Sequence, residues 1–314
     1  MTAQARAPGT APAIPLSAYG HLLAIYIVWS GSYLAVKVTL AGGPAAITVL
    51  QLQSARLWLA SGLLGLVTLL RHGLPPRPSR RDIGFCVASG LVMWMGGNGL
   101  ATLASRHATS SFIVMAMGAI PLWACLLDIV VERVVPSRRM ILGLLLGLFG
   151  LFLVVSPTLL GGHTVIIEPG YAEFTVLLVV GAGLSWSLGT IIQRPLMRRL
   201  RPEWAATFQM LSAAVVLSAL AVGEGAPIPS APNLSQWLAF GFLTVFASVI
   251  GLTSYIKVIG TFSPIIASTF AYVNPVIGVL LGWIILGEQL EPVSLAGLGV
   301  VLASIAIVLS GRAR

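Results

Sequence analysis

The sequence predicts an all-helical integral membrane protein, with ten transmembrane helices arranged as two inverted five-helix repeats. Composition supplies the first observation: 57% of the 314 residues are hydrophobic and only 9% are charged, whereas soluble domains carry about 25% charged residues. The mean hydropathy is correspondingly high, at +0.96. The second observation is a series of apolar stretches long enough to cross a bilayer, which takes roughly 20 residues. The third is an internal repeat of the sequence.

Glycine, proline and charged residues separate the apolar stretches from one another. RHGLPPRPSRR, VERVVPSRR and QRPLMRRLRPE are clusters of this kind, and such residues favour turns and loops. Residues 1–15 are expected to form a disordered cytoplasmic tail. The apolar stretch that follows is too long for the core of a signal peptide, so we expect it to be retained. The ten predicted helices are 16–40, 44–70, 82–105, 107–131, 139–156, 172–193, 203–222, 235–257, 262–286 and 293–310.

The basic residues are divided unevenly between the two sides of these helices. Because positively charged loops stay in the cytoplasm, the bias predicts that both termini are cytoplasmic. It also accounts for the net charge of +9, so the lipid bilayer is an expected partner and nucleic acid is not. Of the 18 Lys and Arg residues, fifteen fall on one side, namely Arg6, Arg71, Arg77, Arg80, Arg81, Arg133, Arg138, Arg139, Arg194, Arg198, Arg199, Arg201, Lys257, Arg312 and Arg314.

The internal repeat keeps its order along the chain, at an offset of 154–158 residues. The matching segments are IVWSGSYLAVK with LSWSLGTIIQR, QLQSA with QMLSA, ATSSFIVMAMGAIP with FSPIIASTFAYVNP, and VERVVP with GEQLEP. Four matches in register predict a duplicated unit. The first repeat is expected at 16–156 and the second at 172–310. A periplasmic linker at 157–171 joins them, and a cytoplasmic C-terminus follows at 311–314.

The odd number of helices in each repeat determines how the two repeats are related. The second repeat must start on the opposite side of the membrane, so an axis in the membrane plane relates it to the first. This inverted arrangement is typical of secondary transporters, whose substrate site lies near the midplane between the repeats. Polar residues within the first and sixth helices are therefore expected to face a central cavity.

Several segments resemble the EamA domain of the drug/metabolite transporter superfamily. They are VWSGSYLAVK in the first helix, the region around Arg56, and AIPLWACLLDIVVERVVP in the fourth helix. The segment YVNPVIGVLLGWIILGEQLEPVSLAGLGVVLASIAIVLSG resembles the end of the unit more fully, and the first repeat departs from it in the shorter VVERVVP. The resemblance covers residues 16–310. It implies a ten-helix carrier of the bacterial inner membrane that exports amino acids or other metabolites. The chain also resembles bacterial aromatic amino-acid exporters of this group.

Aromatic and polar side chains at midplane depth are the candidates for lining the cavity. An amide in hydrocarbon needs a partner or a water-filled space, whereas aromatic side chains have packing or lipid contact as an equally simple role. Methionines would add adaptable apolar walls, and such a pocket suits amphipathic substrates such as aromatic amino acids. The predicted substrate-binding residues are Trp29, Tyr33, Arg56, Asn98, Met115, Met117, Trp186, Tyr272 and Asn274.

Arg56 lies in the middle of the second predicted helix, and a charge at that depth marks a functional site by default. No acidic residue lies at a comparable depth in the predicted helices. One partner for Arg56 is a substrate carboxylate. In the alternative, Arg56 is a structural staple that bonds Gln51, Gln53, backbone carbonyls or water. Both roles stay open at this point.

Two prolines are expected to shape the movement of the repeats. Pro121 and Pro275 each remove a backbone hydrogen bond in mid-helix, so kinks are predicted in the fourth and ninth helices. These kinks would let the repeats rock around the site. The expected assembly is a monomer or a weak homodimer.

The acidic residues bear on how transport is driven. All nine lie in loops or near helix ends on these boundaries. A midplane carboxylate of the kind that carries protons is therefore missing from the predicted helices, which favours a uniporter-like exporter.

The sequence holds no nucleotide-binding loop, metal-ligand cluster or nucleophile–base motif, so no cofactor is expected and an intramembrane enzyme is a distant alternative. A sugar-phosphate, nucleotide-sugar or drug exporter of the same fold is the main alternative.

Overall fold

The computed structural model describes residues 14–41, 47–75, 77–108, 110–160, 167–225, 229, 232–277 and 292–310. The regular secondary structure of this part of the chain is helical, apart from an antiparallel bridge between Ala108 and Ile167. The all-helical fold class is thus confirmed for the described residues. Six spans among them are long and apolar enough to cross a bilayer, namely Leu16–Leu40, Val49–His72, Arg80–Ala104, Ala172–Leu196, Pro202–Gly223 and Leu234–Ile259.

The elements follow one another in two comparable series. In the first half the helices are α1 (Leu16–Ser30), α2 (Ser32–Leu40), α3 (Val49–His72), α4 (Arg80–Gly90), η1 (Leu91–Gly99), α5 (Leu100–Ala104), α6 (Ser110–Met117), α7 (Ile120–Val130) and α8 (Arg138–Leu160). In the second half they are α9 (Ala172–Ile192), η2 (Arg194–Arg198), α10 (Pro202–Gly223), α11 (Leu234–Gly241), η3 (Phe242–Ile250), α12 (Gly251–Ile259), α13 (Pro264–Ala267), a helix at 270–277, and α15 (Pro292–Ser310).

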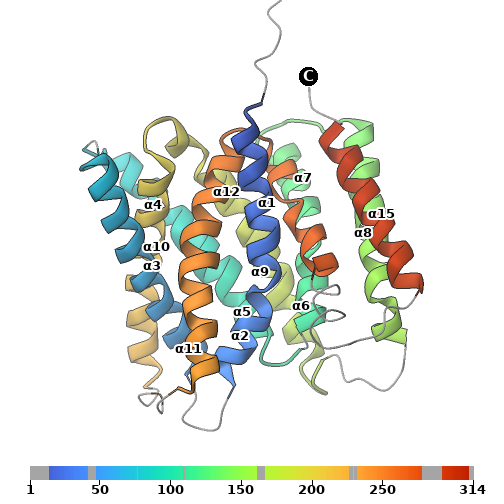
Figure 1. The fold of residues 1–314 in the computed structure, drawn as a ribbon, viewed down its shortest axis with the longest axis horizontal. Helices are drawn as coiled ribbons and strands as arrows, with labels where there is room; N and C mark the ends of the chain where they lie inside the picture. The colour runs from blue at the N-terminus through green and yellow to red at the C-terminus, as the bar shows by residue number, and fades with distance from the viewer. Residues whose placement is uncertain are drawn as a thin grey trace, which may run out of the picture.

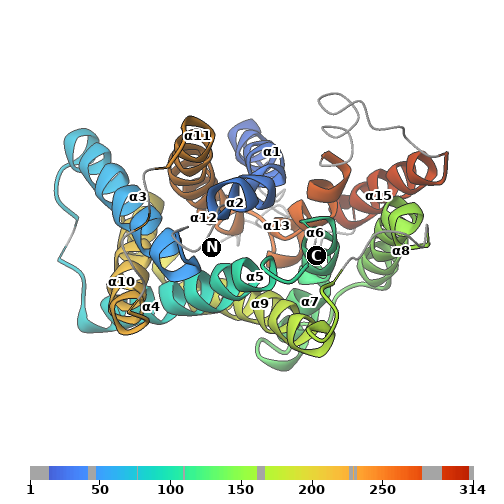
Figure 2. The same cartoon turned by 90° about the horizontal axis from the view of Figure 1, so that it is seen from below.

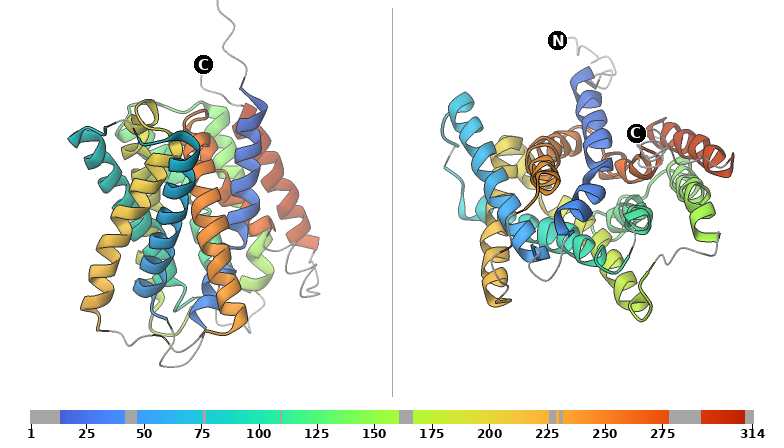
Figure 3. Two further views of the ribbon diagram at one scale, coloured as in Figure 1. Left: turned by 60° about the vertical axis from the view of Figure 1, so that its left-hand side comes forward. Right: turned by 60° about the horizontal axis from the view of Figure 1, so that its bottom comes forward.

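The helices form a bundle with two opposite faces. On one face, α1 begins and α15 ends (Figure 1); we call it the termini face. The face on which α2 ends and α3 begins is the far face. Seen from the far face, α3 pairs with α10 at one edge and α8 pairs with α15 at the other, while the remaining helices lie between them (Figure 2). The left-hand view of Figure 3 shows most helices running between the two faces.

Two helical spans contain a π-helical segment at their centre. Residues 91–99 form η1 between α4 and α5, and residues 242–250 form η3 between α11 and α12. In η3 the hydroxyl of Ser248 donates to the carbonyl of Leu243, five residues back, at 2.9 Å. π-helical turns often occur at functional sites, because they widen the helix and redirect side chains. Both segments contribute to the site described below.

The two predicted proline kinks take a different form in the structure. The fourth span is interrupted at residues 118–119, between α6 and α7, and Pro121 stands in the first turn of α7. A proline there costs little, because the first backbone N–H groups of a helix have no intrahelical acceptor. Pro121 therefore lies just after a break instead of in mid-helix. The ninth span is likewise interrupted at 268–269, and Pro275 lies within the helix that follows, at 270–277.

Candidate functional site

A cavity lined by apolar, aromatic and polar side chains lies between the two halves of the chain. Its lining extends to α2, α5 and α6, which lie toward the far face (Figure 1). The cavity volume is about 50 Å³, and a water molecule needs roughly 10–15 Å³ of such space. It therefore has room for a few waters and must widen before a metabolite can enter. The lining residues are Trp29, Ser32, Tyr33, Val36, Arg56, Trp94, Gly97, Asn98, Thr102, Met117, Ile120, Trp186, Phe270 and Asn274.

Arg56 is the charged residue of this lining and is only 2% exposed. Its Nε donates to the hydroxyl of Ser248 on η3 at 2.7 Å, and its Nη1 donates to Oδ1 of Asn98 on η1 at 3.4 Å. The guanidinium carbon lies 5.3 Å from the ring centre of Trp94, which gives a cation–π contact. The two π-helical segments thus hold Arg56 from both sides. A guanidinium has five N–H donors, so these contacts leave donor capacity toward the cavity.

Asn98 is oriented by a neighbouring glutamine. The amide nitrogen of Gln53 donates to Oδ1 of Asn98 and to the hydroxyl of Thr102, each at 2.7 Å. Because the Asn98 oxygen accepts from both Gln53 and Arg56, its NH₂ group is the part left for a ligand. Trp94 adds another donor: it is 1% exposed, and its indole N–H has no hydrogen-bond partner among the described residues.

An aromatic layer closes the cavity toward the termini face. The Trp29 ring lies 5.3 Å from Trp186 and 4.7 Å from Phe270 between ring centroids, in edge-to-face geometry. Tyr255 packs behind both tryptophans, at 5.4 and 5.5 Å. Its hydroxyl forms a 2.8 Å hydrogen bond with Thr190, one helical turn beyond Trp186 on α9. Such contacts are favourable for aromatic rings, so the four rings pack together as one layer.

Ion pairs lie beyond this layer, at the termini face. Arg194 contacts Asp128 at 2.8 Å and Glu132 at 3.1 Å, and Arg199 contacts Asp82 at 3.1 Å. Each of these pairs joins the second half of the chain to the first. A further pair, Lys257 with Glu203 at 2.9 Å, lies within the second half. The described residues contain no cluster of three His, Cys, Asp or Glu side chains that could hold a metal ion.

The structure brings most of the predicted site residues together. Seven of them line the cavity, namely Trp29, Tyr33, Arg56, Asn98, Met117, Trp186 and Asn274. Tyr272 does not appear in the lining, because it packs beside Gly147 and its hydroxyl donates to the carbonyl of Leu144 on α8 at 2.9 Å. The backbone of Met115 belongs to α6, but its side chain lies outside the described part of the structure.

Ser248 and Trp94 are the important residues that the candidate set lacks. Ser248 belongs to a span of ordinary apolar composition, and its role depends on the π-helical register of η3 and on its contact with Arg56. Nothing in the sequence pairs these two residues, which are 192 positions apart. Trp94 stands in the glycine-rich segment MWMGGNG at the middle of its helix. The mid-helix position of Trp94 could have identified it as a site residue, because a buried indole N–H normally has a hydrogen-bond partner.

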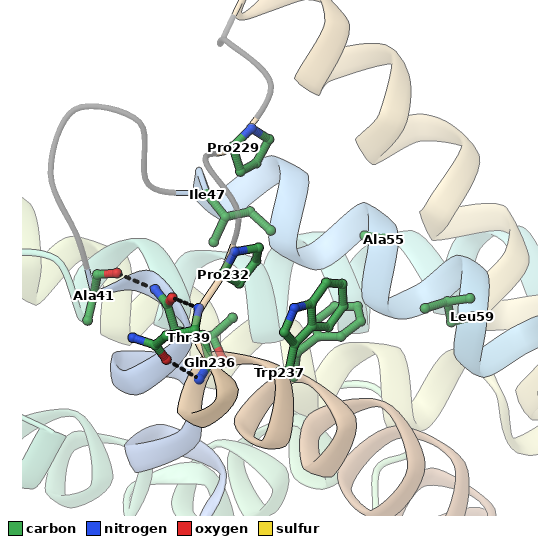
Figure 4. Close-up of a pocket in the computed structure, with 11 residues that line it drawn as sticks. Thr39, Ala41, Ile47, Ala55, Leu59, Pro229, Pro232, Gln236 and Trp237 are labelled. Atoms are coloured by element: carbon green, nitrogen blue, oxygen red, sulfur yellow. Dashed lines mark hydrogen bonds between the residues drawn. The ribbon is translucent and has the colours of Figure 1, made fainter.

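A larger groove of about 580 Å³ lies elsewhere, between α2, α3 and α11 near the far face (Figure 4). Its walls are mostly apolar, and no charged side chain lines it among the described residues. The Gln236 amide is engaged on both sides: it donates to the carbonyl of Ala41 at 2.6 Å and accepts from the backbone of Asn233 at 2.9 Å. Since charge and free donors gather at Arg56, the smaller cavity is the candidate site.

Comparisons with a family model and with known proteins both point to membrane transporters. The model of the EamA-like transporter family matches residues 173–310. The chain is 30% identical to the uncharacterized inner membrane transporter YedA of Escherichia coli K12 over 301 residues, which cover 95% of this chain and 92% of that protein.

More distant relatives have more specific names. A probable amino-acid metabolite efflux pump of Salmonella typhimurium is 24% identical, with 91% of this chain and 92% of that protein covered. An S-adenosylmethionine/S-adenosylhomocysteine transporter of Chlamydia trachomatis is 27% identical, with 87% and 83% covered. A solved crystal structure superimposes with a TM-score of 0.71 at 19% identity and covers 93% of this chain and 96% of its own. That likeness concerns the fold alone.

Proposed function

Since the chain belongs to the EamA-like transporter family, we propose that it exports small metabolites across the bacterial inner membrane, with apolar and aromatic amino acids as its first candidate substrates. The observation that carries this proposal is Arg56, a buried cation in the wall of a cavity between the two halves of the chain. A buried charge without an ionic partner is costly, and a substrate carboxylate offsets that cost. A relative named as a probable amino-acid metabolite efflux pump fits this substrate class.

The proposed architecture is ten transmembrane helices in two inverted repeats, at 16–156 and 172–310. The matching positions of η1 and η3 support it, as do the breaks in the fourth and ninth spans. The edge pairs α3 with α10 and α8 with α15 also join equivalent helices of the two halves. Discontinuous helices around a central cavity recur in transporters built from inverted repeats.

The proposed mechanism is alternating access around this cavity. The aromatic layer and the ion pairs of Arg194 and Arg199 keep the termini face closed, while the cavity extends toward the far face. Rocking of the two halves would break these contacts and open the cavity to the other side. The interruptions at 118–119 and 268–269 are the natural hinges for this movement.

Efflux from proteoliposomes tests the function. We expect vesicles loaded with phenylalanine, tryptophan or leucine to lose it faster than protein-free vesicles, down its own gradient and without a pH gradient. Accumulation against the substrate gradient, driven by a proton gradient alone at zero membrane potential, would exclude uniport. Efflux of a sugar phosphate or a drug without efflux of any amino acid would instead favour the main alternative.

The proposed orientation places both termini in the cytoplasm. Single cysteines are introduced near His163 and Pro229 on one predicted side and near Pro78 and Met197 on the other, in a chain whose native Cys86 and Cys125 are replaced by alanine. A membrane-impermeant maleimide added outside the cell should modify the first two positions and leave the others unlabelled. Labelling at Pro78 from outside would reverse the orientation.

A further inference from the structure

Three side chains around Arg56 present hydrogen-bond donors to the cavity. The guanidinium retains free N–H groups after its bonds to Ser248 and Asn98. The Asn98 NH₂ group is left over once its oxygen has accepted from Gln53 and Arg56. The buried indole N–H of Trp94 has no partner among the described residues. These three side chains converge on one another, and all line the cavity.

The same cavity offers a positively charged group no anionic partner among the described residues. No Asp or Glu lines it among the described residues. Its acceptors are neutral: the hydroxyls of Ser32 and Tyr33 belong to the lining, while both amide atoms of Asn274 are satisfied in the orientation in which its nitrogen donates to the carbonyls of Phe270 at 3.0 Å and Tyr26 at 3.3 Å. An ammonium group brings three donors and a positive charge, whereas an amide N–H brings one donor and no charge.

We propose that this cavity selects singly charged carboxylate anions with an apolar or aromatic body and no free ammonium, such as N-acylated amino acids and aryl-substituted acids, over zwitterionic amino acids. The inference rests on the proposed function and refines its substrate class. In an amino acid the ammonium is attached beside the carboxylate, so it would enter the cavity close to Arg56 and be repelled by it. Acylation removes that charge and leaves the single N–H that a neutral acceptor can bind.

Four compounds that share a phenyl ring test this selectivity. 3-Phenylpropionate and N-acetylphenylalanine carry one negative charge, phenylalanine is a zwitterion, and phenylalanine amide is a cation. Efflux of each is measured from preloaded proteoliposomes at zero membrane potential, with protein-free vesicles as the background. We expect the two anions to have a kcat/KM about tenfold or more above that of phenylalanine, the usual scale for one charged hydrogen bond, and the cation to be slowest.

Two variants connect the selectivity to the residues. Asn98→Asp keeps an oxygen for Gln53 and Arg56 but adds a negative charge and removes two donors, so the preference for the anions should fall by about tenfold. Trp94→Phe keeps an aromatic ring at this position and removes the N–H, which should slow the anions several-fold. Asn233→Asp and Trp237→Phe are the matched controls, since both residues line the separate apolar groove, and neither should change the preference.

The outcomes separate the inference from the proposed function. Faster efflux of phenylalanine than of both anions would overturn the inference and leave amino-acid export standing. Efflux of none of the four compounds would overturn both. A preference for the anions that survives in both Asn98→Asp and Trp94→Phe would show that the selectivity arises elsewhere in the chain, and so would overturn the assignment to this cavity.

Discussion

Arg56→Gln should reduce the kcat/KM for efflux of a carboxylate substrate by at least about tenfold, while slowing an uncharged amide or ester analogue much less. Hydrogen bonds to charged groups contribute about 1.5–3 kcal/mol, which corresponds to roughly 10- to 150-fold. Glutamine can still bond Ser248 or Asn98, but it carries no charge for the substrate. The measurement is efflux from proteoliposomes containing the variant, compared for the acid and its neutral analogue.

The stability of the same variant distinguishes the two roles that the sequence left open for Arg56. A residue kept for binding carries an uncompensated charge in the protein interior, so replacing it should leave the melting temperature unchanged or raise it. If Arg56 is instead a structural staple, the variant should have a lower melting temperature, and efflux of the acid and of its neutral analogue should fall equally. Arg71→Gln is the control on the same helix, because Arg71 is exposed at the end of α3. It should alter neither efflux nor stability.

The fold class could be predicted because the membrane restricts what a chain can do. In hydrocarbon every backbone polar group must bond within the chain, so long apolar stretches become helices. The irregular parts of those helices could not be predicted. Gly31 separates α1 from α2 beside the ring of Phe242, and the π-helical turn of η3 includes the bond from Ser248 to Leu243. Both depend on contacts or registers that composition does not encode.

The site was predictable where the internal repeat supplied information. The match of Trp29 with Trp186 placed two rings at equivalent depth, and their centroids lie 5.3 Å apart in the structure. Tyr272 shows the opposite case. It was grouped with Asn274 by depth, but residues two apart on a helix point in nearly opposite directions. Asn274 lines the cavity, and Tyr272 therefore faces α8.

Arg194→Gln should open the termini face, with a large effect on turnover. Arg194 contacts Asp128 and Glu132, and Asp128 is only 5% exposed. Removing the cation leaves a buried carboxylate without its partner and a second acid beside it. Because the Arg194 side chain is 28% exposed, solvent screening moderates the cost to about 1–3 kcal/mol, less than for a fully buried pair. Losing the pair destabilises the closed form by this amount, because the paired residues come from different halves of the chain.

A cysteine at position 190 reports this opening directly. Thr190 is 2% exposed and lies between the aromatic layer and the ion pairs. In a Cys86→Ala, Cys125→Ala background, Thr190→Cys should react slowly with an impermeant maleimide in inside-out vesicles. Adding Arg194→Gln should speed that reaction about 5- to 150-fold, as expected for 1–3 kcal/mol, and lower the maximal efflux rate. Arg139→Gln, at the exposed start of α8 on the same face, is the matched charge control.

Rescue makes the test specific to the ion pair. Asp128→Asn, added to Arg194→Gln, removes the orphaned charge and should bring the labelling rate at position 190 back toward that of the parent. If the effects of the two substitutions on the labelling rate are instead additive in a double-mutant cycle, the ion pair contributes nothing to closure. Unchanged labelling in Arg194→Gln, with efflux intact, would leave the aromatic layer of Trp29, Trp186, Tyr255 and Phe270 as the barrier on this face. Since edge-to-face ring pairs each contribute about 0.5–1.5 kcal/mol, that layer can hold the closed form only if its rings act together. The ion pair is therefore the contact whose loss should be seen first.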